Sequence, residues 1–385
     1  MQGNLVAHSK KLWALDPHTK GKHLVLKEYL DAWLPIVGTV SDELVIIDGF
    51  SGPGEYAQGE PGSPQIMLDA FQEHSYKNLI RGNVTYHFVE KHPERFMHLE
   101  QLVSCKYKSS QKRLKYEVHN ESFNQDLCTN LLQTYDSCSG KKSCFIMIDP
   151  FGVSDTPMEL VKNLIRRPKV EIFISIMYEH LNRFKKQNEF QPHLNALFGT
   201  DNWQEIIDID DSSVRHRKLV ELYKEQLKKS GASQVIHFDL YRGNKLIYTI
   251  FFASNHWKGS DKMKAAIWKA IPDGSFRYVG DDGGLLNNSY DKDYSLLINQ
   301  IQERLHGLIY TVSDILEYIG SDRTGFPTGG VKKNVLKPME KNNLIEPIND
   351  KRKKKFTYPD NFQFRILPKK EPSSPEALTE NMSLI

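Results

Sequence analysis

Residues 44–54 read LVIIDGFSGPG, an apolar run followed by an acid and a glycine-rich turn. Gly52 and Gly54 allow the backbone to turn sharply and to approach a ligand without a Cβ in the way. Pro53 fixes φ between them and stiffens the turn. Asp48 stands at the carboxyl end of the predicted strand, where open α/β sheets bind their ligands. The stretch therefore predicts a strand that ends at a site for a polar ligand.

The composition is that of a globular protein, with 39% hydrophobic and 26% charged residues. A length of 385 residues favours two domains. No apolar run is long enough to span a bilayer, and residues 1–10 show no signal-peptide pattern. We therefore expect a cytoplasmic protein with no membrane partner.

The four cysteines give no sign of a metal site or of disulfides. They show no C-x-x-C spacing and no histidines at zinc-finger spacing, so reduced structural thiols are expected. No metal site is predicted. The cysteines are Cys105, Cys128, Cys138 and Cys144.

Apolar runs alternate with amphipathic stretches over the first half of the chain, which predicts a mostly parallel sheet covered by helices on both faces. The pattern then changes to two strand-like runs, at 235–240 and 246–253, joined through Gly243 and Asn244, a hairpin signal. Five alternating units followed by an antiparallel hairpin is the order of Rossmann-like class I methyltransferases. The predicted strands are 43–47, 84–89, 116–118, 144–148 and 170–177, and the predicted helices are 22–37, 64–74, 93–103, 122–135, 158–165 and 214–229.

The C-terminal third contains helical patterns without intervening strands, at 296–305, 311–319 and 331–342. Residues 344–348 and 355–358 are then predicted to pair as a hairpin around a basic run. Three helices followed by a basic hairpin indicate a winged helix-turn-helix domain. The predicted division is a Rossmann-like domain at 1–290, a winged helix-turn-helix domain at 291–367 and a disordered tail at 368–385.

Glu90 follows the second predicted strand and is predicted to bind the ribose of a nucleoside cofactor; the alternative is a charged strand end beside Lys91. A dinucleotide fingerprint opens a helix directly after its glycines, so that the helix dipole meets the pyrophosphate. Here Pro53 interrupts, Glu55 follows, and Pro64 begins the next helix. Acids repel a pyrophosphate but suit a cationic sulfonium, so S-adenosylmethionine is the predicted cofactor. The predicted cofactor-binding residues are Asp48, Phe50, Gly52, Gly54 and Glu90.

Asp149, Pro150 and Phe151 follow the fourth predicted strand, next to the first across the switch point. Methyl transfer to an exocyclic amine needs acceptors for the amine N–H groups, and the Asp149 carboxylate and the Pro150 carbonyl can supply them. Phe151 offers a ring on which a base can stack. Amino-methyltransferases use a [D/N]-P-P-[F/Y] motif in this way, and D-P-F-G is similar. The alternative is an ordinary turn in which Asp149 caps the following helix.

Basic residues gather on the third C-terminal helix and on the predicted wing. Their spacing and placement suggest a surface that contacts nucleic-acid phosphates, although such runs are also common on solvated faces. They are Lys332, Lys333, Lys337, Lys341, Lys351, Arg352, Lys353, Lys354 and Lys355.

Several motifs in one order together resemble the three-Cys-motif partner family, abbreviated TcmP. The resemblance covers about residues 21–275 and, more loosely, the C-terminal region; Ser51 stands where the family usually has alanine. It implies a Rossmann-type methyltransferase fold, a C-terminal winged helix and a companion protein that carries the three cysteines. The motifs are residues 48–56 with Gly59, residues 62–64, 88–91, 148–152, 182–184, 258–259, 263–264 and Trp268.

The predicted function is S-adenosylmethionine-dependent methylation, acting on an exocyclic amine of a nucleic-acid base, with DNA and RNA both open as the partner. The alternative is a nucleic-acid-binding partner protein that keeps the fold without the reaction. D-P-F-G lacks the second proline of the commoner motif, which motivates that alternative.

Overall fold

The computed structural model describes residues 12–107, 113–137, 140–152, 155–179, 181, 188–273, 275–279 and 293–369. The chain forms two compact units, which are described separately. The first comprises residues 1–292 together with 319–327, and the second comprises 293–318 together with 328–385.

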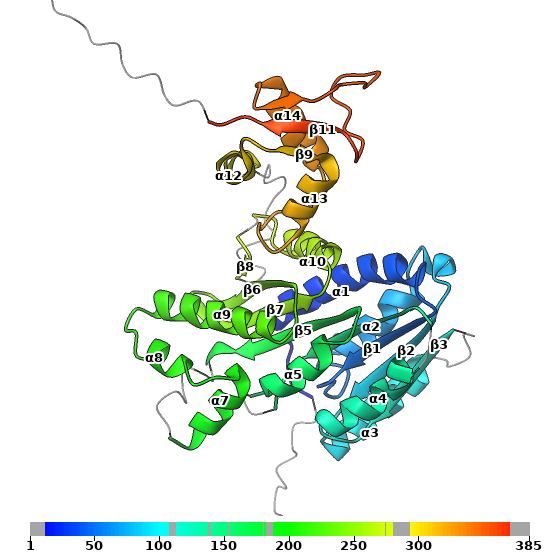
Figure 1. Cartoon of the computed structure of the whole chain (residues 1–385). Coiled ribbons are helices and arrows are strands. Elements are labelled where there is room, and N and C mark those ends of the chain that lie inside the picture. The colour runs from blue at the N-terminus through cyan, green and yellow to red at the C-terminus, as the bar shows by residue number, and fades with distance from the viewer. Residues whose placement is uncertain are drawn as a thin grey trace, which may run out of the picture. The chain divides into compact units, whose positions relative to one another are not determined.

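The first unit is built on an eight-stranded sheet in the order β3-β2-β1-β4-β5-β7-β6-β8 (Figure 1). Strands β1 to β5 are parallel, and β7 is antiparallel to both β5 and β6. The connection between β6 and β7 turns at Gly243, whose φ is +55°. The strands are β1 Glu43–Asp48, β2 Asn83–Val89, β3 Leu114–His119, β4 Lys142–Ile148, β5 Val170–Met177, β6 Gln234–Arg242, β7 Lys245–Ser254 and β8 Arg277–Tyr278.

Helices cover both faces of this sheet, and each face has its own apolar core (Figure 1). The parallel strands are apolar on both faces, as in β4, where every residue is buried. On one face lie α1 Pro17–Gly38, α2 Ser63–Gln72, α3 Pro93–Lys106 and α10 Trp257–Ala270. On the other lie α4 Gln125–Ser137, α5 Met158–Ile165, α7 Gln191–Phe198, α8 Trp203–Ile207 and α9 Ser212–Lys229.

The segment Ile319–Pro327 belongs to the first unit because α10 holds it by hydrogen bonds. The buried Lys264 ammonium donates to the carbonyls of Ile319, Ser321 and Thr324. The Trp268 indole donates to the carbonyl of Gly325 over 2.8 Å. Burial lowers the pKa of Lys264 to about 7. Two residues that carry the TcmP resemblance thus anchor a returning stretch of chain.

The second unit combines a three-stranded antiparallel sheet, in the order β10-β11-β9, with a helical layer. Lys332–Leu336 forms a π-helical turn, η3, that leads into α14. Pro338 cannot donate to the carbonyl four residues before it, and a wider turn accommodates its ring. The elements are α12 Ser295–Leu305, β9 Ile309–Thr311, α13 Val312–Gly320, η3, α14 Lys337–Lys341, β10 Ile345–Pro347 and β11 Gln363–Ile366.

One predicted strand of the C-terminal hairpin is wrong. Residues 355–358 form no strand, and β10 pairs instead with β11, Gln363–Ile366. Phe364 and Ile366 alternate inward and are fully buried, whereas Phe356 is 37% exposed. The alternating apolar residues that pack into the core therefore lie in residues 363–366, after the basic run, and not in residues 355–358.

None of the helices among the described residues has both the length and the apolar character needed to cross a membrane.

Candidate functional site

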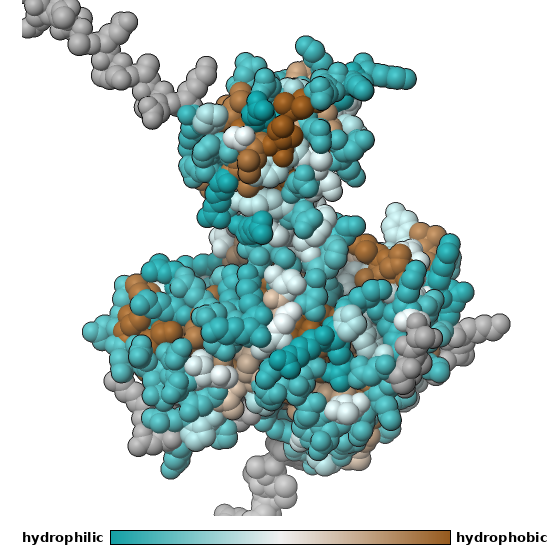
Figure 2. All heavy atoms as spheres, in the orientation of Figure 1, coloured by the Kyte–Doolittle hydropathy of each residue, from teal (hydrophilic) through white to brown (hydrophobic). Residues whose placement is uncertain are grey.

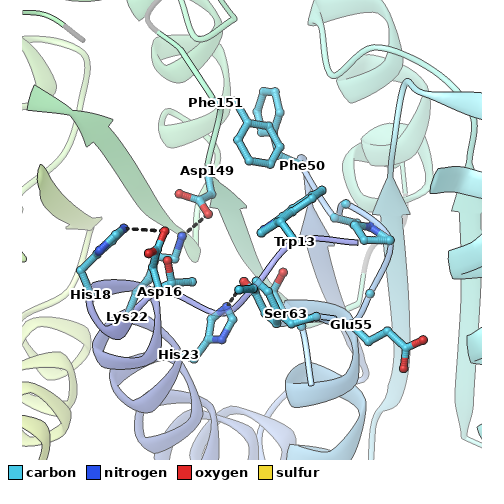
Figure 3. Close-up of a pocket in the computed structure, with 18 of the residues that line it drawn as sticks. Trp13, Asp16, His18, Lys22, His23, Phe50, Glu55, Ser63, Asp149 and Phe151 are labelled. Atoms are coloured by element: carbon cyan, nitrogen blue, oxygen red, sulfur yellow. Dashed lines mark hydrogen bonds and ion pairs between the residues drawn. The ribbon is translucent and has the colours of Figure 1, made fainter. Parts of the chain in front are cut away.

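The loops that follow β1 and β4 meet at one point of the sheet. β1 and β4 are adjacent and parallel, and the strand order reverses between them. Ligands bind at such a switch point, outside the carboxyl ends of the strands. The structure thus brings the glycine-rich turn and the D-P-F-G stretch together, around a cavity of about 240 Å³ (Figure 3).

The glycine-rich turn needs its glycines for two different reasons. Gly52 and Gly54 adopt φ of +61° and +85°, a region that favours glycine. Gly62 has an ordinary φ of −81°, but a Cβ there would lie 2.7 Å from the Gly54 carbonyl oxygen. The Gly62 N–H donates to that same oxygen over 2.8 Å. The backbone at Gly62 therefore packs directly against the turn and fixes its path.

Asp48 stabilises the glycine-rich turn by hydrogen bonds. Its carboxylate is completely buried, accepts from the Phe50 N–H over 3.2 Å and accepts from the Ser63 hydroxyl over 2.7 Å. Burial raises the pKa of Asp48 to about 6. Ser63 lines the cavity, whereas Asp48 is not among the lining residues. Asp48 thus ties the turn to the start of α2, and direct contact with a cofactor stays a prediction. Gly62 occupies the N-cap position of α2, and Ser63 is the first residue of the helix.

Asp149 forms an ion pair with Lys22 of α1, and Figure 3 shows the two side chains pointing toward each other. Lys22 is 4% exposed, and the Asp149 side chain is 18% exposed. The lysine ammonium also lies 5.4 Å from the centre of the Tyr248 ring. Oδ2 of Asp149 accepts a hydrogen bond from the Lys22 ammonium. Among the described residues, Oδ1 accepts no hydrogen bond. One oxygen of Asp149 is therefore free to accept from a ligand.

Two histidines beside this ion pair are neutral at neutral pH. Burial lowers the pKa of His23 to about 3, and the Lys22 charge acts in the same direction. Burial also lowers the pKa of His18, against the opposing effect of Asp16. His23 Nε2 lies 3.5 Å from the Tyr56 hydroxyl. The cavity thus has a buried ion pair flanked by two neutral imidazoles, and Asp16 and Glu55 also line it.

Aromatic rings lie at the border between this cavity and a second, adjoining cavity. The Trp13 and Phe151 rings lie edge to face, with centroids 5.4 Å apart (Figure 3). The Arg95 guanidinium lies 5.0 Å from the Trp13 ring and 5.8 Å from the Phe151 ring. Phe151 is 53% exposed, while Pro150 is buried. An exposed phenyl ring at this point can stack with a planar ligand.

A second cavity, of about 320 Å³, adjoins the first and shares Trp13, Phe50 and Phe151 with it. Glu90 lines this cavity and is 5% exposed. Its Oε1 accepts from the His92 N–H over 2.7 Å, and Oε2 receives no hydrogen bond from any described residue. Phe123 completes an apolar wall. A buried carboxylate beside aromatic rings suits a hydroxylated, ring-bearing ligand.

Sequence reasoning missed Lys22, His23, Trp13 and Tyr248 as residues of the site. Lys22 carries a detectable signal, because it falls on the apolar face of α1 with Leu26, one helical turn away. A charged residue on a buried face needs a partner, and the nearby acid is Asp149. Trp13 precedes the helix in an irregular stretch and gives no such signal.

The predicted basic surface of the second unit is only partly available to a ligand. Arg352 is not available, because its side chain is only 5% exposed and is bonded to Glu340 and Asp350. Arg352 lowers the pKa of Asp350 to about 2 through hydrogen bonds and charge. Lys332 pairs with Asp360 over 2.8 Å. Among the remaining predicted residues, those exposed to solvent are Lys333, Lys341, Lys351, Lys353, Lys354 and Lys355.

Some predicted residues fall outside the described part of the chain. They are Cys138 and the resemblance residues Asn182, Arg183 and Phe184.

No family model matches this chain, and no curated protein matches it. Three solved structures that it resembles are methyltransferases. Trm1 from Pyrococcus horikoshii with S-adenosyl-L-methionine is 11% identical, with a TM-score of 0.38 over 94% of each chain. The O-methyltransferase from Bacillus cereus with SAH is 16% identical, with a TM-score of 0.29 over 65% of this chain and 84% of that chain. The N-terminal domain of human METTL16 with SAH is 12% identical, with a TM-score of 0.29 over 55% and 62%.

Proposed function

We propose that this chain is an S-adenosylmethionine-dependent methyltransferase that acts on an exocyclic amine of a nucleic-acid base. The observation that carries the proposal is the meeting of two adjoining cavities at the switch point, one lined by Glu90 and the other by Asp149. The strand order β3-β2-β1-β4-β5-β7-β6, with β7 antiparallel, is that of Rossmann-like methyltransferases and supports it.

The residues present fit the cofactor. Glu90 would offer its free Oε2 to ribose hydroxyls, and Phe50 and Phe123 would offer rings to an adenine. The close approach of Gly62 to Gly54 keeps the turn narrow for the amino-acid end of the cofactor. No pyrophosphate cradle is present in the described turn, since α2 begins only at Ser63.

S-adenosylmethionine supplies an electrophilic methyl group on a cationic sulfur. The chain's own part is to hold the amine. Asp149 Oδ1 and the Pro150 carbonyl would accept its N–H groups, so that the nitrogen lone pair is aimed at the methyl carbon. Lys22 orients the Asp149 carboxylate through Oδ2. Phe151 would stack on the base, and the amine would lose a proton to solvent after the new N–C bond forms and the S–C bond breaks.

The cofactor part of the proposal is tested by calorimetry with S-adenosylmethionine and S-adenosylhomocysteine. Glu90→Ala is expected to weaken binding by about 10- to 100-fold, because a hydrogen bond to a charged group contributes about 1.5–3 kcal/mol. The matched control is Glu100→Ala, which removes an exposed carboxylate of α3 that lines neither cavity. An absence of heat with the unaltered chain would refute the proposal.

Nucleic acid is proposed as the acceptor because the second unit has the order helix, strand, helix, helix, strand, strand of a winged helix. The loop between β10 and β11 would be the wing. Figures 1 and 2 show this loop projecting from the unit with a hydrophilic surface. Four of its lysines are exposed, and η3 with α14 would be the recognition helix. Membership of the TcmP family, with a companion three-Cys-motif protein as partner, is part of this proposal.

Neutralising the wing should weaken nucleic-acid binding and flatten its salt dependence. Replacing Lys351, Lys353, Lys354 and Lys355 by glutamine should lower the slope of log K against log salt by up to about 3 to 4, if each lysine contacts a phosphate. Arg352 is left in place because it holds Glu340 and Asp350. Fluorescence anisotropy with labelled DNA and RNA, between low and physiological salt, provides the measurement.

A control for the wing replaces four exposed lysines of the first unit by glutamine. They are Lys77, Lys115, Lys218 and Lys229. Equal slopes of log K against log salt for the wing variant and the unaltered chain would mean that the wing is an ordinary solvated loop.

The second candidate function is a nucleic-acid-binding partner protein without activity. The ion pair between Lys22 and Asp149 favours it, because the lysine competes with an amine for that carboxylate. Transfer of a labelled methyl group to cellular DNA and RNA fractions separates the two functions, since transfer that depends on this chain rules out the inactive form.

A further inference from the structure

Two histidines and a glutamate converge at the edge of the large sheet, and none of the three lines either of the two cavities. β2 and β3 are parallel neighbours, with His87 opposite Glu117 and Val89 opposite His119. Side chains alternate along a strand, so Glu117 and His119 project to one face, and His87 projects to the same face from β2. β3 is the terminal strand of the sheet, which leaves this group open to solvent on one side.

The three ligand atoms form a small triangle. His87 Nδ1 lies 3.1 Å from His119 Nε2 and 3.5 Å from Glu117 Oε2. His119 Nε2 lies 3.8 Å from the same carboxylate oxygen. The side chains of His87 and His119 are 10% and 18% exposed, while that of Glu117 is 59% exposed. A glutamate this exposed is free to turn to solvent, yet it faces both imidazoles.

We propose that His87, Glu117 and His119 form a binding site for a divalent transition-metal ion of the zinc type, with water in the fourth position. In a tetrahedral site with metal–ligand distances of about 2.0–2.1 Å, neighbouring ligand atoms lie about 3.3–3.4 Å apart. The three separations of 3.1, 3.5 and 3.8 Å bracket this value. The side chains therefore need to move by only a few tenths of an ångström.

The donor set selects the kind of metal. Two imidazoles and one carboxylate suit zinc and its neighbours in the first transition row, whereas magnesium and calcium prefer all-oxygen sites. Cysteine spacing gave no hint of this site. The available signal is the E-x-H alternation on one strand with a histidine on the strand before it.

A metal here would act as a cross-link between β3 and β2. His119 Nε2 would be held by the ion, and the His119 carbonyl accepts from the Glu90 N–H over 3.0 Å. Asn120, the next residue, donates to the Glu90 carbonyl over 2.9 Å. The metal would therefore fix the backbone on which Glu90 stands.

The test titrates the full-length chain, stripped by a chelator, with Zn²⁺ in a calorimeter and with Co²⁺ in a spectrophotometer. We expect one site whose Co²⁺ absorption has the intensity of four-coordinate geometry. Removal of an outer partner of a metal ligand weakens binding by about 10- to 100-fold, so Glu117→Gln and His119→Ala should each weaken it by at least ~100-fold. Glu117→Gln keeps the shape of an exposed side chain, and circular dichroism should show it folded.

The matched controls remove the same residue types elsewhere. Glu43→Gln changes a carboxylate at the start of β1, and His193→Ala removes an exposed histidine of α7. Both controls should bind Zn²⁺ and Co²⁺ as the unaltered chain does. The proposal is overturned if the unaltered chain binds neither ion, or if Glu117→Gln and His119→Ala bind both with unchanged affinity and spectrum.

Discussion

Replacing Asp149 by alanine is expected to lower the free energy of unfolding by about 3–5 kcal/mol, because it leaves a buried ammonium without its partner. Lys22 is 4% exposed, so water solvates its charge poorly after the substitution. The value should fall toward the lower end of this range, since the cavity lies beside the pair. Urea unfolding followed by circular dichroism at neutral pH measures the change.

The matched variants separate the ion pair from the shape of the site. Asp149→Asn keeps an acceptor oxygen, and Lys22→Met keeps most of the lysine's volume without its charge. The double variant Lys22→Met with Asp149→Asn leaves no buried charge and should be more stable than the sum of the two single changes predicts. If the single changes each cost less than about 1 kcal/mol and simply add, the pair is not what holds α1 at the switch point.

The second large effect is expected from Gly62→Ala, which should weaken cofactor binding by about 100-fold. Its φ of −81° is allowed for alanine, so no backbone strain arises at the residue itself. The new Cβ would lie 2.7 Å from the Gly54 carbonyl oxygen and 2.8 Å from the carbonyl carbon. Both are backbone atoms, so the whole turn must shift, and the loss of one hydrogen bond to a charged group of the cofactor, about 1.5–3 kcal/mol, weakens binding this much.

Gly59→Ala is the control, because alanine there has a strained backbone but no close contact of its Cβ, the opposite of Gly62→Ala. Gly59 has a φ of +86°, and no atom of the described chain lies within 4 Å of a Cβ built there. Left-handed strain should cost about 1–2 kcal/mol of stability and leave cofactor affinity nearly unchanged. Calorimetry and urea unfolding on both variants give the comparison. Equal losses of affinity would mean that packing of Gly62 on the turn does not shape the cavity.

The parallel part of the fold could be predicted from the sequence because buried parallel strands are nearly continuous apolar runs. Each of the first seven predicted strands lies within two residues of the observed one; Val170–Met177 agrees at both ends. The start of α1 could not be predicted, because Pro17 and the residues after it lack a clear apolar face. α10 was missed for a similar reason, since Lys264 occupies one of its buried positions.

The candidate site could be predicted where it depends on strand ends. Glu90 follows β2 and Asp149 follows β4, the strands on either side of β1, so topology alone brings them near the turn after β1. The sequence could not show that α1 supplies Lys22, because that contact joins residues 127 positions apart. It also could not separate Arg352 from the lysines around it, since burial depends on Glu340, which lies in another element.

The return of Ile319–Pro327 to α10 gives the chain an interleaved connectivity. The polypeptide leaves the first unit, enters the second, comes back and leaves again, so no single cut separates them. A chain ending at residue 292 would lack the three carbonyls that receive the Lys264 ammonium and the one that receives the Trp268 indole. A first unit made without the second therefore needs residues 319–327 rejoined to it by a linker.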